Sequence, residues 1–361
     1  MIGKRRRRAR GAILWGLLAF ATIQVALEAA VERQPKWRDP AYAEKLLKLQ
    51  RRLPAAPDNT PVVVVLGSSR TQNDIDASHL EEELAARCGR RVSAFNFGLK
   101  AAGPLNELIV LRRLLADKVR PDLLVVEVMP AFLAETGGPF LFTFFPPHTF
   151  SIEELSLIDG FSSGAGLGHD WWKGRLIPSQ THRLGLMHDV ALSWLPPDAW
   201  STSVGSCDDA GWQSLWRDAQ TDERREKGME WARREYIDHF KNFRLGGSSC
   251  RALTEILNLC RAEGIPAALL LLPEITEFRS WYSPDVEDQL EAFLGDLGRK
   301  YAATVINGRA WVTDEEFFDG HHLLPQAATD FAERLGPRLS PLLGERAQST
   351  ARRTTVTNAW K

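Results

Sequence analysis

The sequence predicts an α/β fold in which helices cover both faces of a five-stranded parallel sheet. Three observations carry this prediction. Short β-branched apolar runs alternate with segments of helical periodicity, and the runs are apolar throughout instead of alternating with polar residues. Polar residues able to carry chemistry follow several of these runs directly. Continuous apolar strands alternating with helices are typical of parallel sheets buried on both faces.

The predicted elements follow in chain order. The five strands share a short length and an apolar composition: residues 62–66, 91–97, 123–128, 266–272 and 303–306. The helices have apolar side chains on one face: residues 80–88, 105–118, 250–263, 286–301 and 327–335. Gly264 directly follows one of them, as is typical of a helix end.

A long insertion after the third strand interrupts this alternation. Residues 131–245 are rich in Trp, Phe, Pro and Gly, include a charged helix at 231–240, and are too long for a simple loop. We expect a lid or subdomain over the edge of the sheet. Its tryptophans would either stack on sugar rings or pack the subdomain: Trp171, Trp172, Trp194, Trp200, Trp212 and Trp216.

The N-terminus has the pattern of an export signal. Residues 4–10 read KRRRRAR, and residues 11–27 are apolar apart from Thr22 and Gln24. Such a segment is long enough to cross a bilayer, and the cationic flank favours a cytoplasmic N-terminus with the remainder outside. Small residues at 26–30 leave a cleavable signal peptide as the alternative. Residues 1–32 are therefore predicted to be an anchor or a signal peptide on an exported protein.

The remaining boundaries follow from composition. Residues 33–60 are polar and predict a stalk with a helix at 42–53. Residues 61–345 are predicted to form the α/β domain, and residues 346–361 are predicted to be a disordered tail. The chain of 361 residues has 44% hydrophobic and 25% charged residues, which is typical of a globular protein. Its net charge of -1 gives no reason to expect a nucleic-acid partner.

The four cysteines predict no metal site. The spacing of Cys88, Cys207, Cys250 and Cys260 matches no zinc pattern. In an exported domain, Cys207 and Cys250 are candidates for a disulfide, whereas Cys260 lies on the apolar side of a helix. The chemistry considered next requires neither a metal nor an organic cofactor.

Two short segments far apart in the sequence predict a catalytic triad. Ser69 directly follows the first strand, and Asp319 and His322 share a loop before the last helix. The carboxyl ends of parallel strands meet at one edge of a sheet, so these residues are expected to converge. Ser69 would be the nucleophile, His322 its base, and Asp319 the group that orients the imidazole. Taken separately, each segment also fits a non-catalytic role: the first as a helix cap or a phosphate-binding turn, and the second as a simple turn.

Further residues are predicted around the triad. The N–H groups of Ser69 and Gly98, with the side-chain amide of Asn96, would hold an oxyanion. Arg70 and His321 are candidates for substrate binding. For Arg70, a structural ion pair is the alternative.

The same residues resemble the SGNH (GDSL-like) hydrolase superfamily. The likeness rests on three blocks: Gly67-Ser68-Ser69-Arg70, Asn96-Phe97-Gly98 and Asp319-x-x-His322-Leu323. It covers roughly residues 60–130 and 250–340, and it implies a three-layer, flavodoxin-like sandwich with the site residues above. The third block of that superfamily normally has an asparagine after its strand, whereas this sequence has Glu127-Val128-Met129-Pro130. A carboxylate cannot donate a hydrogen bond to an oxyanion unless it is protonated.

The expected function follows from the resemblance and the export signal. The resemblance is strongest to membrane-anchored, exported branches that acylate cell-surface polysaccharides. It implies a serine esterase or O-acyltransferase that acts on acyl esters, chiefly acetyl esters, of an envelope or exopolysaccharide glycan. The alternative is a non-catalytic scaffold or glycan-binding component of a polysaccharide assembly complex in the envelope. Both place the chain on the membrane through its N-terminal helix.

Overall fold

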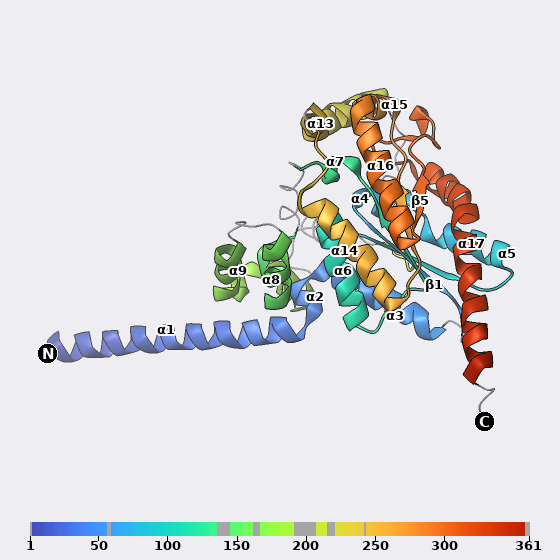
Figure 1. Cartoon of the computed structure of the whole chain (residues 1–361). Helices are drawn as coiled ribbons and strands as arrows, with labels where there is room; N and C mark the ends of the chain where they lie inside the picture. Colours follow the sequence, from blue (N-terminus) through green and yellow to red (C-terminus); the bar gives the residue numbers. More distant parts are fainter. Residues whose placement is uncertain are drawn as a thin grey trace. The chain divides into compact units, whose positions relative to one another are not determined.

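A computed structural model of the chain confirms the α/β class. Five parallel strands form one sheet in the order β2-β1-β3-β4-β5 (Figure 1). Their bounds are β1 (Val62–Gly67), β2 (Ser93–Gly98), β3 (Leu123–Glu127), β4 (Ala267–Leu271) and β5 (Thr304–Asn307). The structure describes residues 2–55, 59–135, 145–161, 167–190, 207–214, 221–241 and 243–357.

The structure contains the predicted helices and additional ones. Before the sheet lie α1 (Ile2–Arg33), α2 (Pro35–Arg38) and α3 (Pro40–Ala55). Between β1 and β3 lie α4 (Ser69–Asp74), α5 (Ala77–Cys88) and α6 (Pro104–Ala116). Between β3 and β4 lie α7 (Pro130–Leu133), η2 (Pro147–Thr149), α8 (Ile152–Phe161), α9 (Leu167–Leu176), α10 (Pro178–Thr181), α11 (Arg183–Val190), α13 (Asp222–Lys241) and α14 (Gly247–Glu263). The chain continues with α15 (Thr276–Arg279), α16 (Pro284–Tyr301), η4 (Asp314–Glu316) and α17 (Pro325–Thr357).

Helices cover both faces of the sheet, as the apolar strands require. Helices α6, α14 and α16 line one face, and α5 packs against α17 on the other (Figure 1). Right-handed crossovers produce this division, because the chain moves in one direction from β1 to β2 and in the opposite direction afterwards. All residues of β2, β3 and β4 are buried, whereas β5 is an edge strand with alternating exposure.

The strand order places the polar segments together. The chain reverses direction across the sheet at β1, whose two neighbours are β2 and β3, and a switch point of this kind is where ligands bind in open parallel sheets. Gly67 at the end of β1 pairs with Gly98 at the end of β2, and Leu66 pairs with Val126, one residue before Glu127. The residues after β1 therefore lie between the ends of β2 and β3.

The chain forms two compact units. One contains residues 1–44 and 145–205, and the other contains residues 45–144 and 206–361 with the whole sheet. The predicted insertion is therefore divided: residues 145–205 belong with the N-terminal helix, whereas α7 and α13 belong with the sheet.

Two predictions outside the sheet are wrong. Cys207 and Cys250 form no disulfide: the Cys207 sulfur lies 3.4 Å from Lys48 Nζ, and the Cys250 thiol donates to the Leu133 carbonyl at 3.5 Å. The final helix does not end near residue 335, because α17 extends from Pro325 to Thr357. Residues 342–357 contain many good helix formers, which explains the continuation. Residues 358–361 lie outside the described residues.

Candidate active site

Ser69 occupies the turn from strand β1 into helix α4. Ser68 caps this helix, since its hydroxyl accepts a hydrogen bond from the Arg70 N–H at 3.1 Å. Ser69 is thus the first helical residue, and it is half-buried. Its N–H is one of those that a helix leaves without an intrahelical partner.

Asp319 and His322 meet Ser69 from a tight loop between η4 and α17. His322 Nε2 lies 3.0 Å from Ser69 Oγ, and His322 Nδ1 lies 2.9 Å from Asp319 Oδ2. The other oxygen of Asp319 accepts the N–H groups of His321 and His322, at 2.9 and 2.8 Å. The structure thus brings the three residues into the connected order serine, imidazole and carboxylate.

The charges in this loop suit an orienting acid and a base. Burial alone would raise the pKa of Asp319, but the charge and ring hydrogen bond of His322, with the backbone hydrogen bond from His321, hold it well below its usual value. Burial alone would lower the pKa of His322, but the Asp319 carboxylate raises it above the ordinary value for histidine. Asp319 is therefore ionised at neutral pH and stabilises the imidazolium form of His322.

Asp74 completes the support of the loop from helix α4. Its Oδ1 accepts the N–H of Leu323 at 2.8 Å, which ties α4 to the residue after His322. The carboxyl is fully buried, and burial raises its pKa to about 8. Asp74 is consequently protonated at neutral pH, although it lies close enough to His322 to interact with it electrostatically.

Glu127 holds the serine turn from the end of β3. Its carboxylate accepts the Ser68 N–H at 2.7 Å, the Ser68 hydroxyl at 3.0 Å and the Thr71 hydroxyl at 2.7 Å. Gly67 permits this approach, because a Cβ there would collide with Thr71 Oγ1 and Glu127 Oε2. The residue that departs from the expected asparagine is therefore a clamp on the turn that presents Ser69.

Arg70 is part of the same buried network. Its side chain is 1% exposed, and it donates to the carbonyls of Leu272 and Pro273 at 3.0 and 2.8 Å. Its guanidinium also lies 3.6 Å from Glu274 and 3.9 Å from Glu127. The prediction that Arg70 binds substrate is corrected to its alternative, an internal ion pair that links the serine turn to residues 272–274.

His321 is also removed from solvent. It is 1% exposed and is enclosed by aromatic rings, with Tyr236 at 5.4 Å, Phe278 at 6.3 Å and the stacked Trp231 at 5.8 Å between ring centroids. Burial lowers the pKa of its imidazole to about 3, so the ring is neutral. The predicted substrate contact for His321 is therefore wrong in this structure, since the ring packs against α13 instead.

The predicted oxyanion donors of the second block point elsewhere. The Gly98 N–H donates to Asn96 Oδ1 at 2.9 Å. The Asn96 amide group donates to the carbonyls of Thr71 and Ile75, at 2.6 and 2.8 Å. Asn96 is fully buried, so its predicted role as an oxyanion donor is wrong. Of the three predicted donors, the Ser69 N–H is the one that these bonds do not occupy.

Two parts of the insertion pack on this edge of the sheet. Residues 207–214 lie against β2 and α4: the Asn96 N–H donates to the Ala210 carbonyl at 2.8 Å, and the Trp212 indole donates to the Asn73 carbonyl at 2.7 Å. Helix α13 lies against the loop of Asp319. A Cβ on Gly228 would collide with Asp319, reaching 3.0 Å from its Cα.

Helix α13 contributes two residues that the sequence analysis did not single out. Trp231 is 53% exposed although its ring stacks on His321. Glu235 follows one helical turn later, and one of its oxygens is buried without a hydrogen-bond partner in the described part of the chain. Burial raises the pKa of Glu235 to about 7, and the carboxyl interacts with the charges of His322 and Asp319. Of the other predicted tryptophans, Trp194, Trp200 and Trp216 lie outside the described residues.

The loop also meets a minimum requirement for metal binding. Asp319, His321 and His322 bring one potential ligand atom each within 4.8 Å of one another. The acceptor positions of Asp319, however, are used by two backbone N–H groups and the ring of His322. These bonds suit a hydrogen-bonded triad better than a ligand set.

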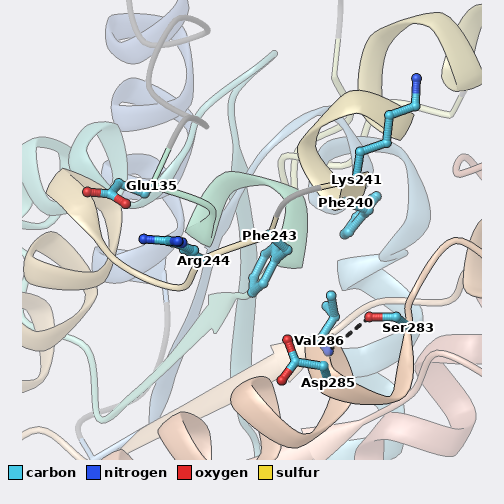
Figure 2. A pocket seen from close by; sticks show the side chains of 8 residues that line it. All are labelled: Glu135, Phe240, Lys241, Phe243, Arg244, Ser283, Asp285 and Val286. Atoms are coloured by element: carbon cyan, nitrogen blue, oxygen red, sulfur yellow. Dashed lines mark hydrogen bonds between the residues drawn. The ribbon is translucent and has the colours of Figure 1, made fainter.

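A pocket of about 660 Å³ lies at the far end of α13 from Gly228 (Figure 2). Phe240 and Phe243 lie within it, and charged side chains that include Lys241 and Arg244 surround them. About 13 Å of helix separates Trp231 from Phe240, at roughly 1.5 Å of rise per residue. Ser69, Asp319 and His322 are not among the residues that line this pocket.

Comparisons with known proteins add little to this geometry. No family model and no curated protein matches the chain. Fourteen chains of solved structures match, among them a mutant of the esterase AlinE4, with a TM-score of 0.30 and 12% sequence identity. That match covers 69% of this chain and 77% of the esterase. At this level of similarity, the chemistry must be inferred from the residues of the site alone.

Proposed function

We propose that the chain is a serine esterase or O-acyltransferase with Ser69 as nucleophile, His322 as general base and Asp319 as the orienting acid. The observation that carries this proposal is the connected pair of contacts from Ser69 Oγ to His322 Nε2, at 3.0 Å, and from His322 Nδ1 to Asp319 Oδ2, at 2.9 Å. This is the geometry in which a histidine can take the proton of a serine hydroxyl.

The reaction proceeds in two halves. Ser69 Oγ forms a bond to the ester carbonyl carbon while its proton passes to His322 Nε2. The tetrahedral intermediate then collapses: the bond from the carbonyl carbon to the alcohol oxygen breaks, and His322 returns the proton to that oxygen. In the second half, His322 deprotonates water or a sugar hydroxyl, which attacks the acyl-serine and releases Ser69. Water gives hydrolysis, and a sugar hydroxyl gives acyl transfer.

The oxyanion side of the site is predicted to be weak. The Ser69 N–H at the start of α4 is the remaining candidate donor to the charged carbonyl oxygen. The Gly98 N–H, by contrast, is held by Asn96. Because one missing oxyanion donor reduces turnover by about 10²–10³-fold, slow hydrolysis of unactivated esters is expected.

The proposed substrate is an acyl ester of a glycan, with acetyl as the group tested first. Trp231 supports this class, because its exposed ring lies on His321, next to the base, and a rigid aromatic face suits a sugar ring. Export also supports it. Residues 7–33 of α1 form a helix long and apolar enough to cross a membrane, and a domain placed outside the cytoplasm meets envelope glycans.

A second candidate function is a non-catalytic, glycan-binding scaffold in an envelope assembly complex. The closed hydrogen bonds of Asn96 and Gly98 favour it, because they occupy two expected oxyanion donors. The 3.0 Å contact between Ser69 and His322 counts against it, since a scaffold does not require an activated serine.

The deciding experiment compares Ser69→Ala with Ser280→Ala, an exposed serine at the end of α15. Full-length protein in detergent is incubated with 4-nitrophenyl acetate, with acetylated xylan, and with a fluorophosphonate probe. We expect wild type and Ser280→Ala to release acetate and to be labelled at Ser69, and Ser69→Ala to lose about 10³-fold or more of the activity. Wild-type protein that neither turns over nor becomes labelled would exclude the enzyme and leave the scaffold.

The substrate class is tested at Trp231. We expect Trp231→Ala to raise KM for acetylated xylan about 10-fold more than for 4-nitrophenyl acetate, since an aromatic contact contributes about 0.5–1.5 kcal/mol. Trp172→Ala is the matched control, because Trp172 is an exposed tryptophan of the other unit. An equal change of KM for both substrates would argue against a sugar contact at Trp231.

A further inference from the structure

The unit of residues 1–44 and 145–205 has an exposed apolar surface that its packing does not explain. Helix α1 changes character along its length: Leu17 and Ile23 are exposed, whereas Gln24 and Val31 are buried. The exposed part belongs to the segment able to cross a membrane. The buried part is therefore the place where the rest of this unit attaches.

Charged and polar contacts fix this attachment. The Ser179 N–H on α10 donates to Gln24 Oε1 at 3.2 Å. Arg175 on α9 pairs with Glu28 at 2.8 Å and with Glu32 at 2.6 Å. Helices α9 and α10 are thus held against α1 beside the last turns of its apolar segment.

Four large apolar side chains of this unit are exposed: Trp172 and Leu176 on α9, Ile177 between α9 and α10, and Ile152 on α8. Trp172 is 61% exposed, Leu176 67%, Ile177 39% and Ile152 59%. Trp172 and Leu176 are four residues apart on α9 and share one face of it. The neighbouring Trp171 shows the contrast, because it is buried and its indole donates to the Phe150 carbonyl at 2.9 Å. We call Trp172, Leu176, Ile177 and Ile152 the apolar surface.

The bilayer itself is the occupant that fits this surface. The 17 residues from 11 to 27 rise about 26 Å as a helix, close to the thickness of a bilayer core of about 30 Å. Gln24 and Glu28, to which α9 and α10 are bound, therefore lie where α1 leaves the hydrocarbon. Tryptophan is enriched at that depth, where its ring meets lipid chains and its N–H meets headgroups. The exposed Lys173 beside Trp172 can reach lipid phosphates.

We propose that the apolar surface lies in the headgroup region of the membrane that α1 crosses, so that the chain is attached by a helix and by a second, interfacial contact. This inference rests on the membrane anchor of the proposed function, and it is independent of catalysis by Ser69. A rigid second contact restricts how this unit can tilt about α1.

Site-directed fluorescence tests the proposal in the full-length chain. One accessible cysteine replaces Trp172, Leu176, Leu17 or Asp170 in a Cys88→Ser background, in which the three remaining native cysteines, Cys207, Cys250 and Cys260, are buried. Each variant is labelled with an NBD fluorophore and reconstituted into phosphatidylcholine–phosphatidylglycerol vesicles. Leu17 reports on insertion of α1 and is read with lipids that carry the spin label deep in the acyl chain, because it lies within the segment able to cross a membrane. Asp170 is the matched control, since it is exposed on α9 about 160° around the helix from Trp172.

We expect lipids with a spin label near the headgroup to quench the probes at 172 and 176 at least about 2-fold more than the probe at 170. Quenching at 17 but not at 172 or 176 would overturn the apolar surface as a membrane contact and would indicate a protein covering. Absence of quenching at all four positions would overturn the anchor and this proposal with it. Acetate release that depends on Ser69 would stand in either case.

Discussion

Two segments lie at the same edge of the sheet and differ in where their hydrogen bonds lead: the loop of Asp319 and His322, and the turn of Asn96 and Gly98. In the loop, the hydrogen bonds connect the Asp319 carboxylate to the His322 imidazole, and the imidazole to the Ser69 hydroxyl. In the turn, the polar groups bind one another and the backbone of α4. Both segments match a motif at the level of residue identity. Their difference teaches that the destination of each hydrogen bond, rather than the motif, decides which group can act on a substrate.

The strongest test of the loop is Asp319→Asn. The amide leaves the shape intact but cannot hold the imidazole in the productive tautomer or stabilise its charged form, so kcat should fall about 10⁴-fold. Loss of the carboxylate also lowers the pKa of His322, which Asp319 holds above its usual value. The base must be neutral to accept the serine proton, so the acidic limb of the kcat profile should move to lower pH. A profile unchanged in position would contradict the assigned role.

Glu127→Gln tests the clamp beneath the nucleophile. Removing one charge of a buried ion pair is expected to lower the free energy of unfolding by about 3–5 kcal/mol. It should also lower kcat, because the carboxylate holds Ser68 and Thr71. Glu274→Gln is the matched control, since Glu274 faces the same Arg70 without touching the serine turn. If denaturant melts show equal losses of stability and kcat falls equally in both variants, Glu127 has no separate role in placing Ser69.

Asn96→Ala tests the closed turn directly. The variant leaves the carbonyls of Thr71 and Ile75 without a partner, which should lower the free energy of unfolding by about 2–4 kcal/mol. Turnover measured below the melting temperature should change less than about 10-fold, whereas loss of an oxyanion donor would reduce it by about 10²–10³-fold. A loss in that larger range would restore Asn96 to the catalytic machinery.

Asp74→Asn reports on stability as a function of pH. Burial raises the pKa of Asp74 to about 8, so the folded state holds a proton that the unfolded state releases near pH 4. Its contribution to stability is therefore complete below about pH 4 and is lost as the pH rises through about 8. The melting temperature of the variant relative to wild type should rise between pH 5 and pH 9. A difference that is constant with pH would show that Asp74 is ionised in the folded state.

The sequence was sufficient for the sheet and for the convergence of Ser69, His322 and Asp319. Each predicted strand begins within two residues of the observed one, because a continuous apolar run such as residues 62–66 fits few other structures. The order of Ser69, Asp319 and His322 along the chain predicted their meeting, since parallel strands share one carboxyl edge.

Long-range packing decided what the sequence could not. The role of Asn96 depends on the carbonyls of Thr71 and Ile75, and no local signal indicates that they take its amide hydrogens. Glu127 offered one usable signal, a carboxylate at the end of a strand with no charge partner nearby in sequence. The contact of α13 with Asp319 depends on the single glycine of this helix, Gly228. The many charged residues around Gly228 gave no sign in the sequence that this part of the helix packs against another segment.

Because Gly228 packs closely against Asp319, the position of the Asp319 carboxylate depends on helix α13. A shortened chain lacking residues 221–241 would expose the Asp319 backbone and the His321 ring to water. The site around Asp319 would therefore change in structure as well as in accessibility. The insertion and the catalytic loop should accordingly be exchanged between homologous proteins as one block. Two close approaches join them, because a Cβ on Gly228 would collide with Asp319 and a Cβ on Gly320 would collide with Met229.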